Sequence, residues 1–336
     1  MAKPGERNLI TDVDGISVGN AEDIKVKTGA TVILADRPAT AAVSVAGGGP
    51  GTRETDLLHA GTLVNAVDAV CVSGGSAFGL AAADGVAAGL KAAGRGFGLV
   101  DEPGVPKTPI VPAAILYDLA NRGNKDWGDT SPYPALGRAA FEGASAEFAL
   151  GPAGAGFGAL AGKHPGGLGS ASIQTNDGMT IGAIAAVNCF GSVFMPGTDC
   201  FWAWPFEIDG EFGGARPPSD YAADADNWGE AKVNPGLGQN TTIACVATDV
   251  TLTKDQAQRV SQMALSGFSR AIRPVFAPFD GDAVFVLSTG RVPVTGNEPL
   301  TISRIGELAA STLARAIARG VHTSEEIRKD STTPAG

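Results

Sequence analysis

Thr241 stands where a polar segment meets an apolar run, and its hydroxyl could act as a nucleophile. The preceding residues 217–239 are acidic and rich in turn formers, and the apolar strand candidate Thr242–Ala247 follows almost directly. At such a junction the hydroxyl can attack the carbonyl of the preceding residue, Asn240, and an N-to-O shift gives an ester. Water would then release a chain that begins with Thr241. Its α-amine, which titrates at roughly 7.7 to 8.0, can serve as the base for the adjacent hydroxyl.

The triplet Asn240-Thr241-Thr242 has two other interpretations. It is a glycosylation sequon, and Gly-Gln-Asn-Thr is also an ordinary turn before a strand. The sequon is disfavoured because residues 1–20 mix charged residues with Pro and Gly and lack the apolar core of a secretory signal. The residue chemistry alone therefore leaves two alternatives, a turn and a cleavage site.

Lys163 and Tyr117 are polar residues in largely apolar stretches. Lys163 follows a run almost free of charge, and an ammonium in apolar surroundings loses its proton more readily. The alternative is a solvated lysine in a Gly-rich loop. Tyr117 lies between two apolar segments, which suggests either a buried hydroxyl that needs a partner or a purely structural residue.

Asn188, Asp280 and Asp282 stand at the ends of predicted strands. Asn188 follows the apolar run Thr180–Val187, where its amide could bind a developing oxyanion or simply begin a turn. The two aspartates flank a glycine just before the apolar run Ala283–Leu287. They could orient a catalytic amine and hydroxyl, or they could form an ordinary Asp-Gly turn that opens a strand.

Short apolar or β-branched runs and helical periodicity predict the elements that would position these residues. The predicted strands are Thr31–Ala35, Ala41–Ala46, Ala69–Val72, Thr180–Val187, Thr242–Ala247 and Ala283–Leu287. The predicted helices are Ser76–Ala93, Pro134–Glu147, Lys254–Ile272 and Ile302–Gly320, the third with Thr253 as N-cap. The last helix has an apolar stripe and should lie on a sheet. Residues 324–336 are polar and are expected to form a flexible tail.

Composition and charge exclude several classes of function. A formal net charge of −10 without a Lys/Arg cluster argues against nucleic acid as a partner. No run reaches the roughly 18 to 20 apolar residues of a membrane helix, so we expect no membrane segment and a cytoplasmic location. The four cysteines and three histidines lack metal-ligand spacing, which predicts buried thiols and no metal site.

Six blocks, in order along the chain, resemble the DmpA-type L-aminopeptidase/D-esterase family, which includes β-peptidyl aminopeptidases and nylon oligomer hydrolases. They are VSGGSAFGLAAADGV (72–86), ILYDL (115–119), GPAGAGFGALAGK (151–163), AAVNCFGSV (185–193), GQNTTIACVATDV (238–250) and PFDGDAVF (278–285). The Asn-Thr-Thr-Ile form of the cleavage block is most similar to the endo-type 6-aminohexanoate oligomer hydrolases, which use threonine where the aminopeptidases use serine. The aspartate pair supports the same branch, because the β-peptidases carry a Ser and a Glu there.

The resemblance implies a four-layer αββα sandwich formed by one domain, residues 1–336. Self-cleavage would give an α chain, 1–240, and a β chain, 241–336, that stay associated because they share one core. Relatives commonly form tetramers, so an oligomer of such units is expected. The glycine block 73–79 is expected near the active site, where its backbone N–H groups could bind a carbonyl oxygen.

The resemblance also implies a role for each candidate residue. Thr241 matches the nucleophile, and Lys163 matches a lysine beside it that tunes the amine and hydroxyl. Asn188 matches the oxyanion asparagine and Tyr117 a tyrosine of the pocket. Asp280 and Asp282 match the carboxylates that orient the new amine and the hydroxyl. Acyl transfer of this kind requires no metal and no organic cofactor.

Three hypotheses about function follow. The first is an endo-acting hydrolase of 6-aminohexanoate oligomers or similar linear amides. The second is an aminopeptidase of the DmpA type for small peptides and amides. The third is an uncleaved binding protein that keeps the fold and uses Asn240-Thr241 only as a turn.

Overall fold

The computed structural model describes residues 2–100, 102–232 and 240–332, and a large mixed sheet runs through it. The strands are β1 (Ile16–Asp23), β2 (Thr28–Val45), β3 (Thr52–Arg53), β4 (Ala66–Ser73), β5 (Ala113–Ile115), β8 (Gly167–Gln174), β9 (Thr180–Asn188), β10 (Thr241–Val250) and β11 (Ala283–Val292). Their order is β3-β5-β4-β2-β11-β10-β9-β8, and β1 pairs with β2 outside this path. The short strands β6 (Leu160–Ala161) and β7 (His164–Pro165) form a separate pair.

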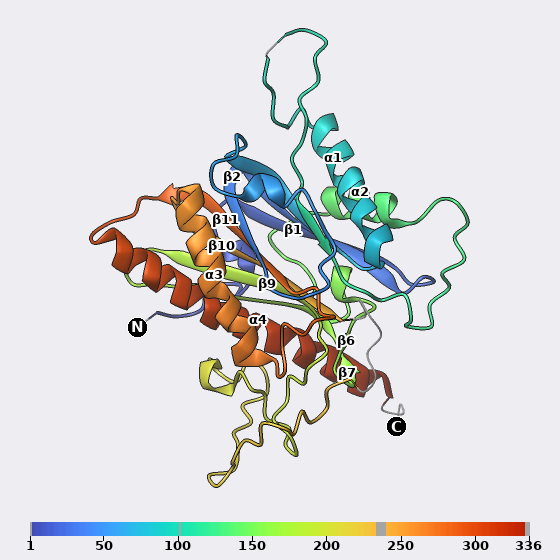
Figure 1. The fold of residues 1–336 in the computed structure, drawn as a ribbon, viewed down its shortest axis with the longest axis vertical. Coiled ribbons are helices and arrows are strands. Elements are labelled where there is room, and N and C mark those ends of the chain that lie inside the picture. Colours follow the sequence, from blue (N-terminus) through green and yellow to red (C-terminus); the bar gives the residue numbers. More distant parts are fainter. Residues whose placement is uncertain (1, 101, 233–239, 333–336) are drawn as a thin grey trace.

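Two pairs of helices cover the sheet on opposite sides (Figure 1). They are α1 (Ala82–Ala92) with α2 (Tyr133–Glu142), and α3 (Lys254–Ala271) with α4 (Glu298–Thr332). One buried apolar cluster joins α1 and α2 to β2, β4 and β5, and another joins α3 and α4 to β8, β9, β10 and β11. Burial of these apolar faces is the main force that holds the helices on the sheet.

A third apolar cluster lies between the two halves of the sheet and completes four layers. Its members come from β1, β2 and β4 on one side and from β9, β10 and β11 on the other. The strand β2 belongs to both halves, and its pairing with β4 shifts register between Leu34 and Ala39. The two β layers are therefore continuous through β2, and the predicted four-layer αββα sandwich is confirmed.

Most predicted elements lie where the sequence placed them, but the C-terminal region is different. The N-cap at Thr253 is confirmed, and its hydroxyl accepts a hydrogen bond from the Gln256 amide. The last helix does not end at Gly320, and the expected tail from residue 324 is helical through Thr332. It continues because Ser324 is buried and because Glu325 pairs with His164 at 3.0 Å. Residues 333–336 of the expected tail lie outside the described residues.

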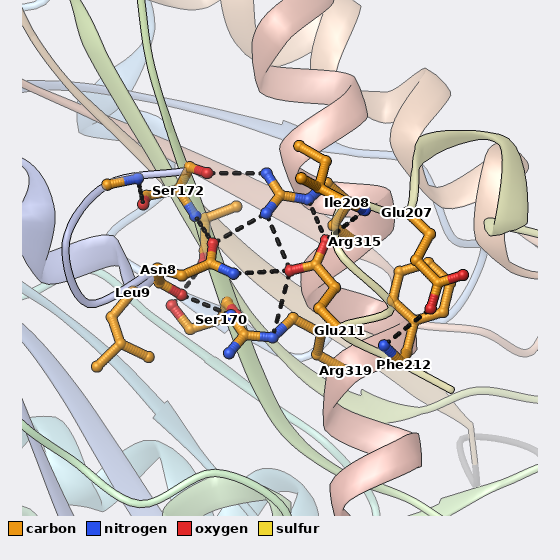
Figure 2. Close-up of polar contacts among 12 residues, drawn as sticks. Asn8, Leu9, Ser170, Ser172, Glu207, Ile208, Glu211, Phe212, Arg315 and Arg319 are labelled. Atoms are coloured by element: carbon orange, nitrogen blue, oxygen red, sulfur yellow. Dashed lines mark hydrogen bonds and ion pairs between the residues drawn. The ribbon is translucent and has the colours of Figure 1, made fainter. Parts of the chain in front are cut away.

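A buried polar network ties α4 to segments that precede β10 (Figure 2). Arg315, only 2% exposed, donates to Glu211 Oε2 at 2.9 Å, Asn8 Oδ1 at 2.9 Å and the Ser172 carbonyl at 2.8 Å. Arg319 adds a second pairing with Glu211 at 3.6 Å. A buried guanidinium needs such partners to offset its loss of hydration, so this network fixes the position of the C-terminal helix.

All four cysteines are buried and unpaired, as the sequence predicted. Within the described ranges, no helix is both long enough and apolar enough to span a bilayer.

Candidate active site

Thr241 is the first residue of β10, a central strand, and is almost completely buried. The strand lies antiparallel to β9, which places Thr241 directly opposite Asn188. On its other side β10 runs parallel to β11, and an isolated bridge pairs Asn240 with Asp280. Sheet register therefore brings the junction residues, Asn188 and Asp280 together, although they are far apart in sequence.

The Thr241 hydroxyl lies against the carbonyl group of the bond that would be cut. Its Oγ1 donates a hydrogen bond to the carbonyl oxygen of Asn240. The amide N–H of Gly281 donates to that same carbonyl oxygen at 3.1 Å and to Oγ1 at 3.2 Å. A backbone donor on the carbonyl oxygen can stabilise the negative charge that develops when a nucleophile attacks the carbon. This arrangement fits attack by Thr241 on its own preceding peptide.

Gly281 is required here by close packing. A Cβ atom at this position would lie 2.7 Å from Thr241 Oγ1 and 3.0 Å from the carbonyl oxygen of Gly49. Any side chain would therefore displace the hydroxyl or the loop. The Asp-Gly-Asp sequence thus holds a donor against the hydroxyl, which an ordinary surface turn would not need.

Asn240 is a buried polar residue at the junction. The residue is 0% exposed, and neither its amide oxygen nor its amide nitrogen has a hydrogen-bond partner among the described residues. Burying an amide in this way costs free energy, on the order of 1–3 kcal/mol.

Asp280 and Asp282 form a buried carboxylate pair beside the junction. Asp282 accepts from the amides of Thr242 at 2.6 Å and Phe276 at 3.2 Å. Asp280 Oδ2 accepts from the Ala277 amide at 3.0 Å, and its Oδ1 is buried with no partner among the described residues. Burial raises the pKa of both carboxyls, and the Asp280 charge raises the pKa of Asp282 further. The pair can therefore accept and release a proton near neutral pH.

Lys232 is a residue of this site that the sequence analysis missed. Its Nζ donates to the Asn188 carbonyl at 3.2 Å and to Asn188 Oδ1 at 3.4 Å. Burial lowers the pKa of its ammonium to about 8, and the negative charges of Asp280 and Asp282 partly oppose that shift. One signal was available, because Lys232 is the single basic residue in the acidic stretch 217–239.

Asn188 is held from two sides. Its Oδ1 accepts from the Leu160 amide at 2.9 Å, and its Nδ2 donates to the carbonyl oxygen of Tyr117 at 3.0 Å. Tyr117 thus contributes its main chain to the site, and its side chain is only partly buried. These contacts fix the amide plane of Asn188 opposite Thr241.

Lys163 lies in the solvated surroundings that were one of its two expected environments. Its side chain is 53% exposed, and its Nζ pairs with Glu230 at 3.3 Å, so the apolar environment suggested by the sequence is not observed. Its role beside Thr241 stays a prediction.

The glycine block also differs from expectation, because its first amides bond within the protein. Gly74, Gly75 and Ser76 donate to the Gly29 carbonyl, Asp118 Oδ1 and the Leu116 carbonyl. These N–H groups are therefore engaged and do not point to a substrate carbonyl.

Two adjoining cavities lead away from Asn188. The inner cavity, about 100 Å³, is lined by Tyr117, Asp118, Asn188 and Lys232 among others. The outer cavity, about 720 Å³, shares Leu160 and three further residues with it. Its size suits a small organic molecule. Among the residues that the structure describes, no group of three or more His, Cys, Asp or Glu side chains is placed to hold a metal ion.

Comparison with known proteins gives consistent results. A model of peptidase family S58 matches residues 8–333. An uncharacterized aminopeptidase of Mycobacterium tuberculosis is 37% identical over 342 residues, 95% of each chain. A 6-aminohexanoate-oligomer endohydrolase of Kocuria sp. is 30% identical, over 93% of this chain and 86% of the relative.

A solved structure shares the fold. It is the L-aminopeptidase D-Ala-esterase/amidase of Ochrobactrum anthropi, described as a variant of the Ntn hydrolase fold. It aligns with a TM-score of 0.67 and 20% identity, over 95% of this chain and 87% of that one.

Proposed function

Because the chain belongs to peptidase family S58, and so to the hydrolases of peptide and amide bonds, we propose that it cleaves itself between Asn240 and Thr241 and then uses Thr241 as an N-terminal nucleophile. One observation carries the proposal. The Thr241 hydroxyl lies against the Asn240 carbonyl, and the Gly281 N–H donates to the carbonyl oxygen at 3.1 Å. Nucleophile, target and oxyanion donor are thus already assembled.

Self-cleavage would proceed by an N-to-O acyl shift. Asp280 is the proposed base, because its backbone pairs with Asn240 and its Oδ1 has no hydrogen-bond partner among the described residues. It would take the proton of Thr241 Oγ1 as that oxygen attacks the Asn240 carbonyl carbon. The Gly281 N–H stabilises the oxyanion. The C–N bond then breaks, and the amine of Thr241 takes up a proton. Water hydrolyses the resulting ester to give a carboxylate on Asn240 and a free hydroxyl on Thr241.

The mature enzyme would use the Thr241 hydroxyl again, now on a substrate. The free α-amine of Thr241 accepts the hydroxyl proton, and Oγ1 attacks the substrate amide carbon. That proton passes to the leaving amine, and water then hydrolyses the acyl ester. Asn188, fixed opposite Thr241 by its contacts with Leu160 and Tyr117, is the proposed oxyanion donor.

Linear amides such as 6-aminohexanoate oligomers are the proposed substrates. The 30% identity to a 6-aminohexanoate-oligomer endohydrolase and the Asn-Thr-Thr-Ile sequence at the junction support this class. Release of N-terminal residues from small peptides is the second candidate, because relatives at 37% identity are named aminopeptidases. An uncleaved binding protein is the non-enzymatic alternative.

Both chains should stay together after the cut. The strand β10 lies between β9 and β11, and α4 packs on β8 and β9. Separation would expose these apolar faces to water.

The test is hydrolysis of two substrate sets by purified protein whose cleavage state is known. Linear 6-aminohexanoate oligomers should be shortened by the wild type and left intact by Thr241→Ala. Release of N-terminal residues from aminoacyl amides without attack on the oligomers would favour the aminopeptidase. An uncut wild-type chain that hydrolyses neither set would contradict the proposal.

A further inference from the structure

The outer cavity combines apolar walls with two cations. Its apolar residues include Ile24, Phe157 and Leu160, and its charged residues are Lys27 and Arg122. No Asp or Glu is found among the described residues that line it. A site of this composition accepts an aliphatic chain that carries a negative charge.

The outer cavity adjoins the inner cavity, which reaches Asn188 of the candidate active site. Leu160, Gly158, Ala120 and Asn121 line both the outer and the inner cavity. The inner cavity extends to Asn188, which lies opposite Thr241. Lys27 and Arg122 line only the outer cavity, so they lie outside the part that reaches Asn188.

The turns that carry the two cations are fixed in place. Asn121 Nδ2 donates to the Lys27 carbonyl at 2.6 Å and to the Gly158 carbonyl at 3.3 Å. Lys27 and Arg122 both adopt the left-handed backbone region, with φ of 55° and 65°. This conformation is uncommon for such residues and costs free energy, and strained residues of this kind cluster at functional sites. The chain thus keeps both cations at the cavity in spite of that cost.

We propose that this outer cavity binds the leaving part of a linear amide substrate, an aliphatic chain whose terminal carboxylate pairs with Lys27 and Arg122. The assignment rests on the proposed amide hydrolysis and adds to it a binding site for the carboxyl end of the substrate. In a linear oligomer of amino acids the free amine lies on the acyl side of each amide, and the free carboxylate lies on the amine side. A cavity with two cations therefore favours the leaving part, which carries the carboxylate, over the acyl part, which carries the amine. The one acidic lining residue, Asp118, belongs to the inner cavity.

Binding to the uncleaved Thr241→Ala chain tests the inference without requiring catalysis. The ligands are a linear trimer of 6-aminohexanoate, the same trimer with its carboxylate converted to a methyl amide, and the trimer with its amine acetylated. Calorimetry should show that the methyl amide binds about five- to tenfold more weakly than the free acid, the effect of two exposed ion pairs. Acetylation should have little effect.

Variants of the two cations test whether they cause the preference for the free acid over the methyl amide. The double change Lys27→Gln with Arg122→Gln should remove the difference between acid and methyl amide. Lys25→Gln, an exposed lysine of the same turn that does not line the cavity, should retain it. Equal affinities for acid and methyl amide in the parent, no measurable binding of either at millimolar concentration, or a preference that survives the double change would each overturn the inference. Failure of the wild type to cleave itself would contradict the proposed function and leave this binding result unaffected.

Discussion

The amide nitrogen of Gly281 lies 3.2 Å from the hydroxyl oxygen of Thr241, on a loop that leaves no space for a side chain. The same N–H reaches the Asn240 carbonyl oxygen at 3.1 Å. One backbone group thus contacts both partners of the proposed acyl shift. Its position depends on the absence of a Cβ atom, which makes the glycine itself a target for mutation.

Gly281→Ala should slow self-cleavage by about 100-fold or more, because a displaced hydroxyl or a lost oxyanion donor each costs about that factor. The rate would be followed by denaturing gel electrophoresis of freshly purified chain. Gly98→Ala, where a Cβ would make only ordinary contacts from 3.5 Å, is the control and should cleave normally. Normal cleavage by a folded Gly281→Ala chain would contradict this role.

Lys232→Met should move the acid limb of the cleavage pH profile upward by roughly 0.5 to 1 pH unit. The Lys232 charge lowers the pKa of both Asp280 and Asp282, so its removal keeps the pair protonated to higher pH. Lys232→Arg retains the charge and should keep the wild-type profile. Lys163→Met tests the competing assignment, and a shift seen only in that variant would favour Lys163 as the tuning residue.

Asp282 should make the stability of the uncleaved chain depend on pH. Burial and the Asp280 charge raise the pKa of Asp282 from 3.8 to about 7. The folded chain therefore holds a proton that the unfolded chain has released. The contribution of Asp282 to the free energy of unfolding is fully present below about pH 4 and is lost as the pH rises through about 7.

The matching measurement is urea unfolding of Thr241→Ala, with and without Asp282→Asn, from pH 4.5 to 7.5. The free energy of unfolding of the parent should fall relative to the double variant by on the order of 2–4 kcal/mol across this range. If the free energies of unfolding of the two variants change in parallel with pH, the pKa of Asp282 is not raised in the folded chain.

Arg315→Met should weaken the association of the two proposed chains. The change leaves Glu211 buried without its close guanidinium partner, and the longer Arg319 contact and the Asn8 and Ile208 amides do not replace that charge, at a cost of about 3 kcal/mol. Size-exclusion chromatography in increasing urea should show that the fragments separate at a lower urea concentration than those of the wild type. Arg304→Met breaks an exposed pair with Asp177, the side chains being 47% and 54% exposed, and should have little effect. If the fragments of both variants separate at the same urea concentration, the Arg315 network does not hold the two chains together.

Part of this architecture can be predicted from sequence, because the spacing of apolar residues indicates which faces of a strand or helix are buried. Strands covered on both faces, such as β9 and β10, are buried throughout and have apolar sequences over most of their length. The strand β8 was missed because its sequence, GLGSASIQ, has small residues in place of β-branched ones. The two predicted strands 31–35 and 41–46 are one strand, because β2 continues through a polar, exposed segment that includes Pro38.

The candidate site was only partly predictable. The resemblance identified Thr241, Asn188 and the aspartate pair, and strand register brings them together. Lys232 could not be placed, because its contact with Asn188 depends on a long-range fold of the chain and not on local spacing. The sequence around Lys163 left an apolar and a solvated environment open, and the fold selects the solvated one.

Self-cleavage is tested most directly by the intact mass of purified protein under denaturing conditions, for the wild type and for Thr241→Ala. We expect two wild-type fragments that divide between Asn240 and Thr241, and a single uncut chain for the variant. A wild-type chain that stays whole after long incubation, or a Thr241→Ala chain that still divides at this bond, would contradict the claim that Thr241 is the nucleophile.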